Sequence, residues 1–246
     1  MRIARTTEEL PREAEIGLVP TMGAFHEGHV SLFRAARAEN EVVVASLFVN
    51  PAQFAEGEDL EAYPRDENRD AEVAEAAGVD VLFVPAAEEI YPEGFQTWVE
   101  VEPLGTILEG EHRPGHFRGV ATVCLRLFNL VRPRRAYFGQ KDAQQVAVVK
   151  RMVHDLAVPV EIRVLPIVRD PDGLALSSRN AYLSPEERER ALALPRALAA
   201  GHRSLLDGLE VDYFEEADFE PRVLAGAVRV GRTRLIDNVV IEGETT

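Results

Sequence analysis

The sequence is poor in cysteine and has no long apolar run, and each shortage excludes a class of protein. Cys124 is the only cysteine among the 246 residues, so no disulfide framework can form and the reducing cytosol is the expected compartment. No apolar stretch approaches the roughly 18 residues that a membrane-spanning helix needs, and the residues after Met1 are charged and polar. We therefore expect neither a membrane partner nor an ordinary signal peptide.

Basic residues are also scarce beside acidic ones. The chain has 27 lysines and arginines against 42 aspartates and glutamates, which gives a formal net charge of −15. A general nucleic-acid binder would show a basic stripe, so we expect no nucleic-acid partner. An acidic protein can still bind phosphate if its few cations converge on one cleft. The hydrophobic fraction of 46% indicates a globular chain with a sizeable core, in one large domain or two unequal ones.

Residues 20–29, with the sequence PTMGAFHEGH, organise the rest of the chain. The apolar run at 16–19 before them is typical of a buried strand, and apolar residues at helical spacing follow from Val30. Gly23 and Gly28 let the backbone approach a ligand without a Cβ in the way. Because a helix N-terminus presents unpaired N–H groups and a positive dipole end, this segment predicts a phosphate site.

Two imidazoles, those of His26 and His29, project from this helix start and predict cationic or proton-donating groups beside the phosphate. A histidine at such a place can also be a cap or a core residue, and a close histidine pair can indicate zinc. Metalloprotease helices, however, place their histidines four residues apart with a glutamate beside the first. Here the spacing is three, Gly28 intervenes and no third ligand is evident, so the pattern favours phosphate over zinc.

Further apolar runs predict the other strands of a parallel α/β sheet. In an open sheet of this kind, ligands bind beyond the carboxyl ends of the strands. Asn50 and Gln53 follow one such run and are placed to hydrogen-bond a substrate, although Asn-Pro can also be turn chemistry alone. The expected strands cover residues 41–49, 79–85, 97–101, 136–139 and 161–168, a helical stripe covers 120–131, and loops are expected at 55–59 and at 112–119.

A later segment has the same pattern as residues 20–29, a short strand followed by the start of a helix. The run 136–139 ends in a glycine, and polar residues then begin a long helix. Lys141 is therefore expected beside a helix N-terminus, where a cation can neutralise a triphosphate. The alternative is a surface lysine that pairs with Asp142.

A third polar segment lies far downstream. Ser177, Ser178 and Arg179 offer two hydroxyls and a guanidinium in a row, which suit phosphate oxygens. The alternative is a capping segment, because serine and asparagine favour turns.

A turn cluster at residues 169–173 marks the expected domain boundary. We predict a Rossmann-like nucleotide-binding domain over residues 1–168 and a small α+β lid domain over residues 169–246. In the second domain a helix is expected to start at Ser184 and to kink or split at Pro195. Its expected strands cover residues 211–214, 226–230 and 233–238.

Residues 20–29 resemble the HxGH signature of the nucleotidyltransferase superfamily, and the longer string PTMGAxHxGH resembles the pantothenate synthetase (pantoate–β-alanine ligase) family. The resemblance covers nearly the whole chain, with strings similar to FGxKDxQQ at 138–145, MSSRN at 176–180 and GxTRLIDN at 231–238. Leu176 stands in place of the methionine, and the segment 215–223 looks shorter than in the family. The resemblance implies a cytoplasmic enzyme that activates pantoate with ATP and Mg²⁺ and transfers the acyl group to β-alanine, as a homodimer.

The resemblance also implies roles for particular residues. It implies His26, His29 and Lys141 as catalytic residues, and Asp70 near Mg²⁺, where the alternative is a solvated helix face. The ATP site would comprise Met22, Gly23, His26, Gly28, His29, Gly139, Lys141, Asp142, Val168, Leu176, Ser177, Ser178 and Arg179. The pantoate site would comprise Pro20, Met22, Asn50, Gln53 and Gln145.

Three other functions are weighed against this one. A simple adenylyl- or cytidylyltransferase acting on a phosphorylated substrate would need more cations in the acceptor pocket than two glutamines offer. A nucleotide-sensing binding protein is disfavoured by the full set of cations in all three segments. RNA binding, by analogy with the aminoacyl-tRNA synthetases, is opposed by the net charge.

Overall fold

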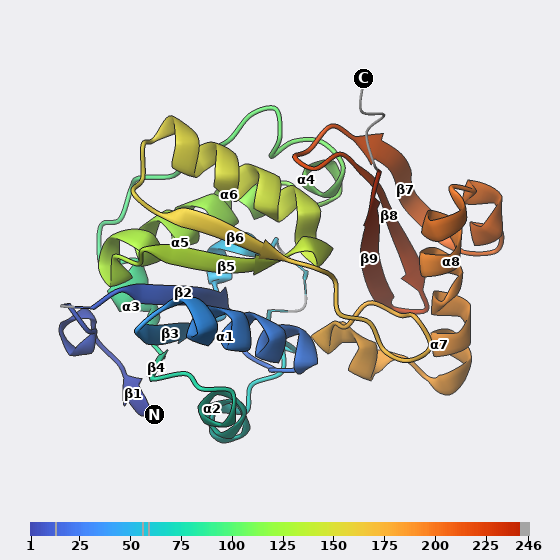
Figure 1. The fold of residues 1–246 in the computed structure, drawn as a ribbon. Coiled ribbons are helices and arrows are strands. Elements are labelled where there is room, and N and C mark those ends of the chain that lie inside the picture. The colour runs from blue at the N-terminus through green and yellow to red at the C-terminus, as the bar shows by residue number, and fades with distance from the viewer. Residues whose placement is uncertain (13, 56, 59, 242–246) are drawn as a thin grey trace.

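Two sheets, one parallel and one antiparallel, form the frame of the molecule (Figure 1). The computed structural model describes residues 1–12, 14–55, 57–58 and 60–241. The larger sheet belongs to the N-terminal two thirds of the chain, and the smaller sheet lies beside the carboxyl ends of the larger sheet's strands.

The six strands of the larger sheet are all parallel and follow the order β1-β4-β3-β2-β5-β6. They are β1 (Arg2–Ala4), β2 (Ile16–Thr21), β3 (Val42–Leu47), β4 (Val81–Phe83), β5 (Arg135–Gly139) and β6 (Glu161–Leu165). Because β2 pairs with both β3 and β5, the strand order reverses at β2, and the segments after β2 and β5 meet at the sheet's carboxyl edge. In open α/β sheets this switch point is where ligands bind.

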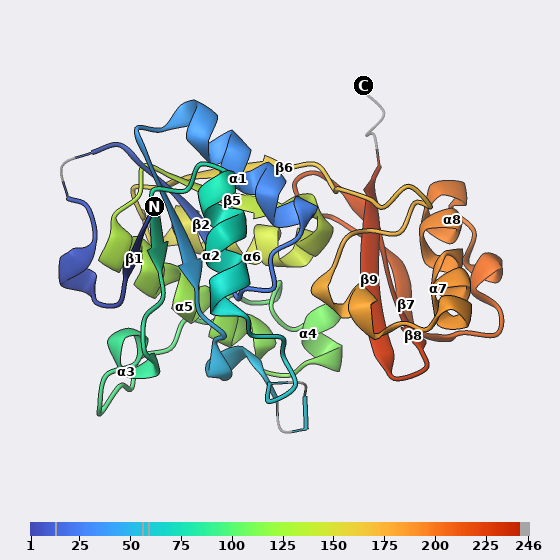
Figure 2. The ribbon, with the colours of Figure 1, turned by 90° about the horizontal axis from the view of Figure 1, so that it is seen from below.

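Helices cover both faces of this sheet, as an all-parallel sheet requires (Figure 2). Helices α1 (Glu27–Glu39) and α2 (Glu67–Ala76) pack on one face, and α5 (His116–Val131) and α6 (Ala143–Asp155) pack on the other. Two one-turn helices, α3 (Ala87–Ile90) and α4 (Glu109–His112), precede α5. Short 3-10 turns cover Thr7–Glu9, Pro51–Gln53, Gln140–Asp142, Ser178–Tyr182 and Arg203–Leu206.

The C-terminal part is an antiparallel sheet backed by helices. It contains α7 (Pro185–Ala191), α8 (Ala193–Ala200), β7 (Glu210–Ala217), β8 (Val223–Val230) and β9 (Thr233–Val240). The helical segment splits at Leu192, as predicted from Pro195, whose ring would clash with the carbonyl of residue 191 in a continuous helix. The α/β class with a small second α+β part is thereby confirmed.

One predicted strand is wrong and one strand was missed. Residues 97–101 form no strand, because the Val99 N–H donates to the Thr122 hydroxyl of α5 (3.0 Å) and Val99 and Val101 pack on the core instead of pairing. Strand β1 has three residues and only one buried side chain, Ala4, so the sequence has no apolar run there that would predict a strand. The predicted loop at 112–119 contains the last residue of α4 and the first turn of α5, with Gly115 in a left-handed conformation between them (φ 82°).

No helix in the described part of the chain is long and apolar enough to cross a bilayer.

Candidate active site

A cavity of about 740 Å³ opens at the carboxyl edge of the parallel sheet and is closed on its far side by the antiparallel sheet. Of the residues predicted for the site, all but Gly23 and Asp70 line it. Those on the wall are Pro20, Met22, His26, Gly28, His29, Asn50, Gln53, Gly139, Lys141, Asp142, Gln145, Val168, Leu176, Ser177, Ser178 and Arg179. Segments more than a hundred residues apart in the sequence therefore converge on one space.

The two histidines of this site start helix α1 and are fixed by backbone donors. The Nδ1 atom of His26 accepts the Gly28 N–H (3.1 Å), and the Nδ1 atom of His29 accepts the His26 N–H (3.3 Å). Since each Nδ1 acts as an acceptor, the proton of each neutral ring resides on Nε2. Both rings therefore offer an Nε2–H donor.

Burial keeps both imidazoles neutral. It lowers the pKa of His26 to about 4, with the charge of Lys141 adding to the effect, and lowers the pKa of His29 to about 3, with His26 adding to it. The ring centroids lie 4.2 Å apart, so two positive rings would repel. The sequence left open whether these histidines are cations or neutral proton donors. Burial favours the neutral, proton-donating form.

Gly28 is required by this geometry. A Cβ on Gly28 would come within 2.9 Å of the His26 ring, and its next neighbour would be Leu176 at 3.9 Å. The start of α1 and the segment that follows β6 thus approach each other closely. Ser177 caps the 3-10 turn 178–182, since its hydroxyl accepts the Arg179 N–H (3.3 Å), so the capping interpretation of this segment holds as well.

Lys141 follows β5 and reaches the cavity from the 3-10 turn 140–142. Its Nζ lies 3.3 Å from a carboxylate oxygen of Asp142, which is the pairing weighed as an alternative. Burial opposes ionisation of Asp142, but the charge and the hydrogen bond of Lys141, together with nearby positive groups such as Arg179, outweigh it and hold the pKa of that carboxyl below its usual range. The pair lies on the cavity wall and not on an outer surface, so this cation faces any anion that enters.

Asn50 and Gln53 form a single hydrogen-bonded unit after β3. Asn50 is 1% exposed, and its side-chain amide donates to the Gln53 amide oxygen (3.1 Å) and to the Gly119 carbonyl (3.2 Å). Its oxygen accepts the Ala52 N–H and the Tyr91 hydroxyl. Asn50 is therefore fully used in holding the turn, whereas Gln53 presents its amide nitrogen beside the Met22 sulfur (3.1 Å) on the cavity wall.

The two adjacent glutamines of α6 have different tasks. The Gln144 side chain accepts the Glu109 N–H (3.0 Å) and donates to the carbonyls of Leu104 and Ile107 (both 2.7 Å). Gln145 lines the cavity and makes no side-chain hydrogen bond to the described residues. The choice of Gln145 over Gln144 as a ligand residue is consistent with this difference.

Asp70 contradicts the alternative that it lies on a solvated helix face. It is 2% exposed, so it is not on a solvated helix face, and it does not line the cavity. Its two oxygens accept the N–H groups of Ala24 and Phe25 (2.8 and 2.7 Å). The backbone of Gly23 and Ala24 has positive φ there (93° and 55°). Asp70 thus fixes the turn that leads to His26, and its place near Mg²⁺ stays a prediction.

Further polar residues reach the cavity from the two segments predicted as loops, 55–59 and 112–119. Arg113 makes two hydrogen bonds to Glu58 (2.8 and 2.7 Å), which ties the predicted 55–59 loop to the start of α5. Residues 56 and 59 of that loop lie outside the described residues. The His116 Nδ1 lies 2.9 Å from the Gln53 carbonyl oxygen, and burial lowers the pKa of His116 to about 4. The HRPGH sequence was the available signal, and its His112, Arg113 and His116 all line the cavity.

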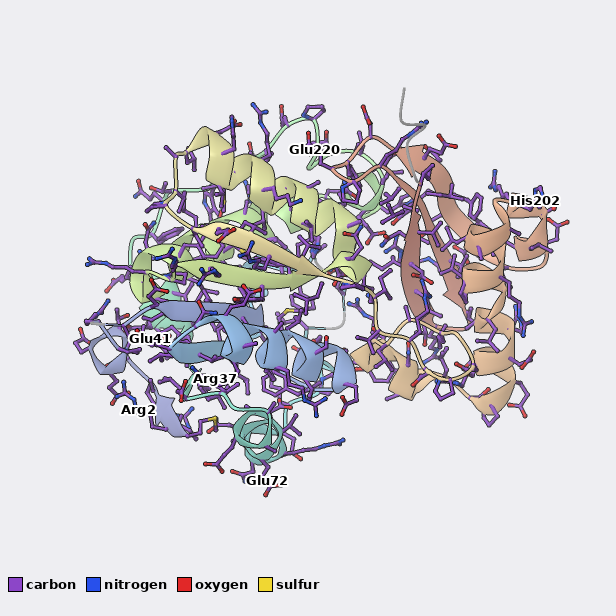
Figure 3. The ribbon with its side chains drawn as sticks, viewed as in Figure 1. Arg2, Arg37, Glu41, Glu72, His202 and Glu220 are labelled. Atoms are coloured by element: carbon purple, nitrogen blue, oxygen red, sulfur yellow. The ribbon has the colours of Figure 1, made fainter. Side chains whose placement is uncertain are left out.

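His154 and His202 do not line the cavity. His202 is exposed beyond α8, at the outer edge of the C-terminal part, where its side chain points to solvent (Figure 3). Within the described residues no group of three or more His, Cys, Asp or Glu side chains is arranged to hold a metal ion.

Comparison with known proteins decides the family. A sequence model described as pantoate-beta-alanine ligase matches residues 1–240. The chain is 52% identical to the pantothenate synthetase of Moorella thermoacetica, an alignment that covers 94% of this chain and 92% of that protein. The chain belongs to the pantoate–β-alanine ligase family. As a member of this family it is an enzyme, a carbon–nitrogen bond-forming ligase.

Solved structures of relatives agree with the pantoate–β-alanine ligase fold. The crystal structure of pantothenate synthetase from Thermus thermophilus superposes with a TM-score of 0.92 at 48% identity and covers 98% of this chain and 99% of that one. The Francisella tularensis pantoate-beta-alanine ligase, described as complexed with beta-gamma ATP and beta-alanine, gives a TM-score of 0.89 at 37% identity, with 98% and 97% coverage. The fold predicted from sequence is therefore that of the family.

Proposed function

We propose that this ligase condenses pantoate with β-alanine at the expense of ATP, through a pantoyl adenylate. The observation that carries the proposal is the order of the cavity segments across the sheet. Gln53 follows β3, the histidines follow β2, Lys141 follows β5 and Ser177–Arg179 follow β6, in strands that adjoin in that order. An uncharged amide thus lies at one end, suited to pantoate, and phosphate-binding groups lie at the other, with the histidines between.

In the first step a carboxylate oxygen of pantoate attacks the α-phosphorus of ATP, and pyrophosphate leaves. Gln53 and Gln145 hold pantoate, with Pro20, Met22 and the Asn50 turn completing its site. Negative charge builds on the phosphate oxygens, so the work of the protein is positioning and charge stabilisation. The Nε2–H groups of His26 and His29 and the Lys141 ammonium are the donors for these oxygens.

The rest of the nucleotide is held by the segments after β2, β5 and β6. Ser177, Ser178 and Arg179 bind the outer phosphates, and Val168 and Leu176 pack near the adenine. In the second step the β-alanine amine attacks the acyl carbon, and AMP leaves with the oxygen that came from pantoate. The amide bond of pantothenate forms as the bond between the acyl carbon and the AMP oxygen breaks.

A covalent acyl-enzyme does not fit this site. Cys124 borders the cavity but is only 4% exposed, and burial raises its pKa to about 12, so its thiolate is not available as a nucleophile. The adenylate is therefore held by non-covalent contacts alone.

The carboxylates that line the cavity indicate whether the protein itself could hold Mg²⁺. In the described chain, Glu58, Glu109, Asp142 and Asp237 line it, and each is paired with a cation: Arg113, Arg234, Lys141 and Arg169. These residues do not form a protein-held magnesium site. Since Mg²⁺ commonly binds through substrate phosphates and waters, we propose that it enters with ATP.

The cellular setting completes the proposal. We propose a cytoplasmic homodimer in which residues 1–168 bind nucleotide and pantoate and residues 169–246 form the lid. The single cysteine and the acidic composition support an intracellular setting.

Isotope labelling tests the order of the chemistry. Pantoate labelled with heavy oxygen in its carboxylate, incubated with ATP and β-alanine, should yield labelled AMP and unlabelled pyrophosphate. An acyl phosphate route would instead place the label in inorganic phosphate and produce ADP. Without β-alanine, pyrophosphate release should stop after about one turnover per site and AMP should stay bound in the adenylate, because AMP leaves only when the amine attacks. Unlabelled AMP, or fast AMP release without the amine, would contradict the proposed mechanism.

A further inference from the structure

Asn238, near the end of β9, touches the backbone that carries Lys141. Its side-chain nitrogen donates to the carbonyl oxygens of Gln140 and Lys141, both at 2.9 Å. Its side-chain oxygen lies 3.4 Å from the Gln140 amide nitrogen. Asn238 is only 2% exposed, and Gln140 is 8% exposed. A residue of the antiparallel sheet thus holds the 3-10 turn at the carboxyl end of β5.

Asn238 is itself held in place by a buried chain of contacts. Its backbone N–H donates to an Asp237 carboxylate oxygen (2.8 Å). Asp237 is 4% exposed, and its carboxylate accepts hydrogen bonds from both terminal nitrogens of Arg169 (2.6 and 3.0 Å). Arg169 follows β6 and also donates to the Gly173 carbonyl (3.1 Å). The segments after β5 and β6 are therefore connected through β9.

We propose that Asn238 is a positioning residue for Lys141, acting across the boundary between the two sheets. The inference rests on the proposed role of Lys141 as the ammonium that meets phosphate. Because both amide hydrogens of Asn238 are used by the two carbonyls, it has none left to offer a ligand, even though it borders the cavity. Its effect on the reaction must pass through the backbone of Lys141.

The chemistry of the contact explains the residue type. Two carbonyl oxygens on consecutive residues need two donors that diverge from one atom, and a primary amide has them. Aspartate has the same shape but only acceptors, so it would face the carbonyls with like charge. Leaving a buried carbonyl unpaired is unfavourable, so the turn would shift toward other partners. A displacement of about 1 Å at a catalytic group can cost on the order of a hundredfold in rate.

The test uses the full-length enzyme and the adenylation half-reaction, followed as pantoate-dependent exchange of pyrophosphate into ATP. Asn238→Ala should slow exchange at saturating substrates by roughly tenfold to a hundredfold, with the KM for pantoate little changed. Asn238→Asp keeps the shape and should slow exchange to a similar extent. Val239→Ala, the next residue, which packs in the other direction against the cluster of the C-terminal part, is the matched control and should exchange at the normal rate.

The second half-reaction separates positioning from general damage. With chemically prepared pantoyl adenylate and β-alanine, Asn238→Ala should form pantothenate at a rate within about twofold of the parent, because Lys141 serves the phosphates that leave in the first step. Equal losses in both half-reactions would mean a general structural role and would overturn the proposal.

A double-mutant cycle decides whether the effect passes through Lys141. Once Lys141→Ala has removed the ammonium, adding Asn238→Ala should slow exchange no further, and fully multiplied losses would overturn the inference. If Lys141→Ala alone leaves exchange near normal in a folded protein, the proposed role of Lys141 fails instead. Lys150→Ala, which changes the only other lysine of the sequence, is the control for that variant. Circular dichroism and thermal unfolding of each variant establish that the compared proteins are folded.

Discussion

The protonation of His26 and His29 follows from where their ring nitrogens lie. Each ring accepts one backbone N–H at Nδ1, and it must give up that hydrogen bond to become doubly protonated. Together with burial, this requirement favours the neutral ring. Both residues can therefore donate a hydrogen bond to phosphate at neutral pH without a change of charge. Among the residues predicted for the phosphate site, only Lys141 and Arg179 are then cationic.

The first prediction concerns the stability that these histidines add at neutral pH. The folded-state pKa of His29, about 3, lies below the ordinary value of 6.5, so the unfolded chain binds the proton more tightly. The corresponding stability is fully present above pH 6.5 and is lost as the pH falls toward 3. His29→Gln should therefore lose less stability than the parent between pH 6.5 and 4.5, by about 1–2 kcal/mol.

Urea unfolding at the two pH values measures this difference. His202→Gln, at an exposed position, is the matched control and should follow the parent. If His29→Gln and the parent lose the same stability on acidification, His29 is not held neutral by the fold.

The second prediction contrasts neighbouring glutamines of α6. Gln145→Ala should raise the KM for pantoate by about tenfold or more, with little change in the KM for ATP or in stability, because the side chain faces the cavity. Gln144→Ala should remove three hydrogen bonds, leave the buried Glu109 N–H unpaired and lower the free energy of unfolding by about 1–3 kcal/mol. Steady-state kinetics and urea unfolding of both variants provide the measurements. A raised KM for ATP in Gln145→Ala would mean that the pocket has been assigned in reverse.

At the residue scale, a place on the cavity wall could be predicted from sequence where a side chain follows a recognisable strand end. His26, Lys141 and Gln53 all lie directly after apolar runs, and all line the cavity. The contacts of Asp70 could not be predicted, because its partners, the N–H groups 45 and 46 residues away, are set by tertiary packing. Asn238 could not be selected for the same reason: nothing local shows that its amide meets the turn of Lys141.

At the scale of elements, the turn 51–53 depends on how closely α5 approaches it. A Cβ on Gly119 would lie 2.3 Å from the Ala52 carbonyl oxygen and 2.6 Å from the Gln53 nitrogen. Both are backbone atoms, so neither can move without displacing the turn. The absence of a side chain at Gly119 lets the Gly119 carbonyl accept the Asn50 amide.

The third prediction follows from this contact. Gly119→Ala should lower the free energy of unfolding by about 1–3 kcal/mol through overpacking and should raise the KM for pantoate, because Gln53 moves with the turn. Arg118→Ala, an exposed position on the same helix, is the matched control. Denaturant unfolding and steady-state kinetics measure the two effects. An unchanged KM for pantoate would show that the turn does not position Gln53.

The elements of the sheet could be predicted from sequence because its strands are buried on both faces and form continuous apolar runs. Strands β2, β3 and β5 lie within about two residues of their predicted bounds. The failure at 97–101 has the opposite cause. Its alternating valines fit a half-buried strand, but they pack on α5, and sequence alone does not show whether a neighbouring strand is available.

At the scale of the whole molecule, the two sheets are fastened by a buried contact layer. Apolar side chains of α6 and of β7 and β8 share one cluster, which includes Ala143, Ala147, Tyr213 and Val223. Beside it, Arg234 makes two hydrogen bonds to Glu109 (2.7 and 2.6 Å), and the Tyr213 hydroxyl adds a third (2.9 Å). A boundary between domains at 168/169 could be proposed from the turn cluster, but this layer could not, since its members are spread over more than a hundred residues.

The last prediction concerns that layer. Burial opposes the charge on Glu109, but the hydrogen bonds and charge of Arg234, together with the Tyr213 hydroxyl and Arg113, outweigh it and hold the pKa of the carboxyl below its usual range. Arg234→Gln should therefore leave a buried carboxylate without its cation and lower the free energy of unfolding by about 3–5 kcal/mol. The double variant Arg234→Gln with Glu109→Gln removes both charges and should recover part of that loss. Arg222→Gln, whose exposed side chain pairs with Glu216, is the control and should change stability by less than about 1 kcal/mol. Calorimetry should show the parent unfolding in one transition, because the buried layer couples the two sheets. Two separate transitions in the parent, or a double variant no more stable than Arg234→Gln, would mean that the ion pair does not join the two parts.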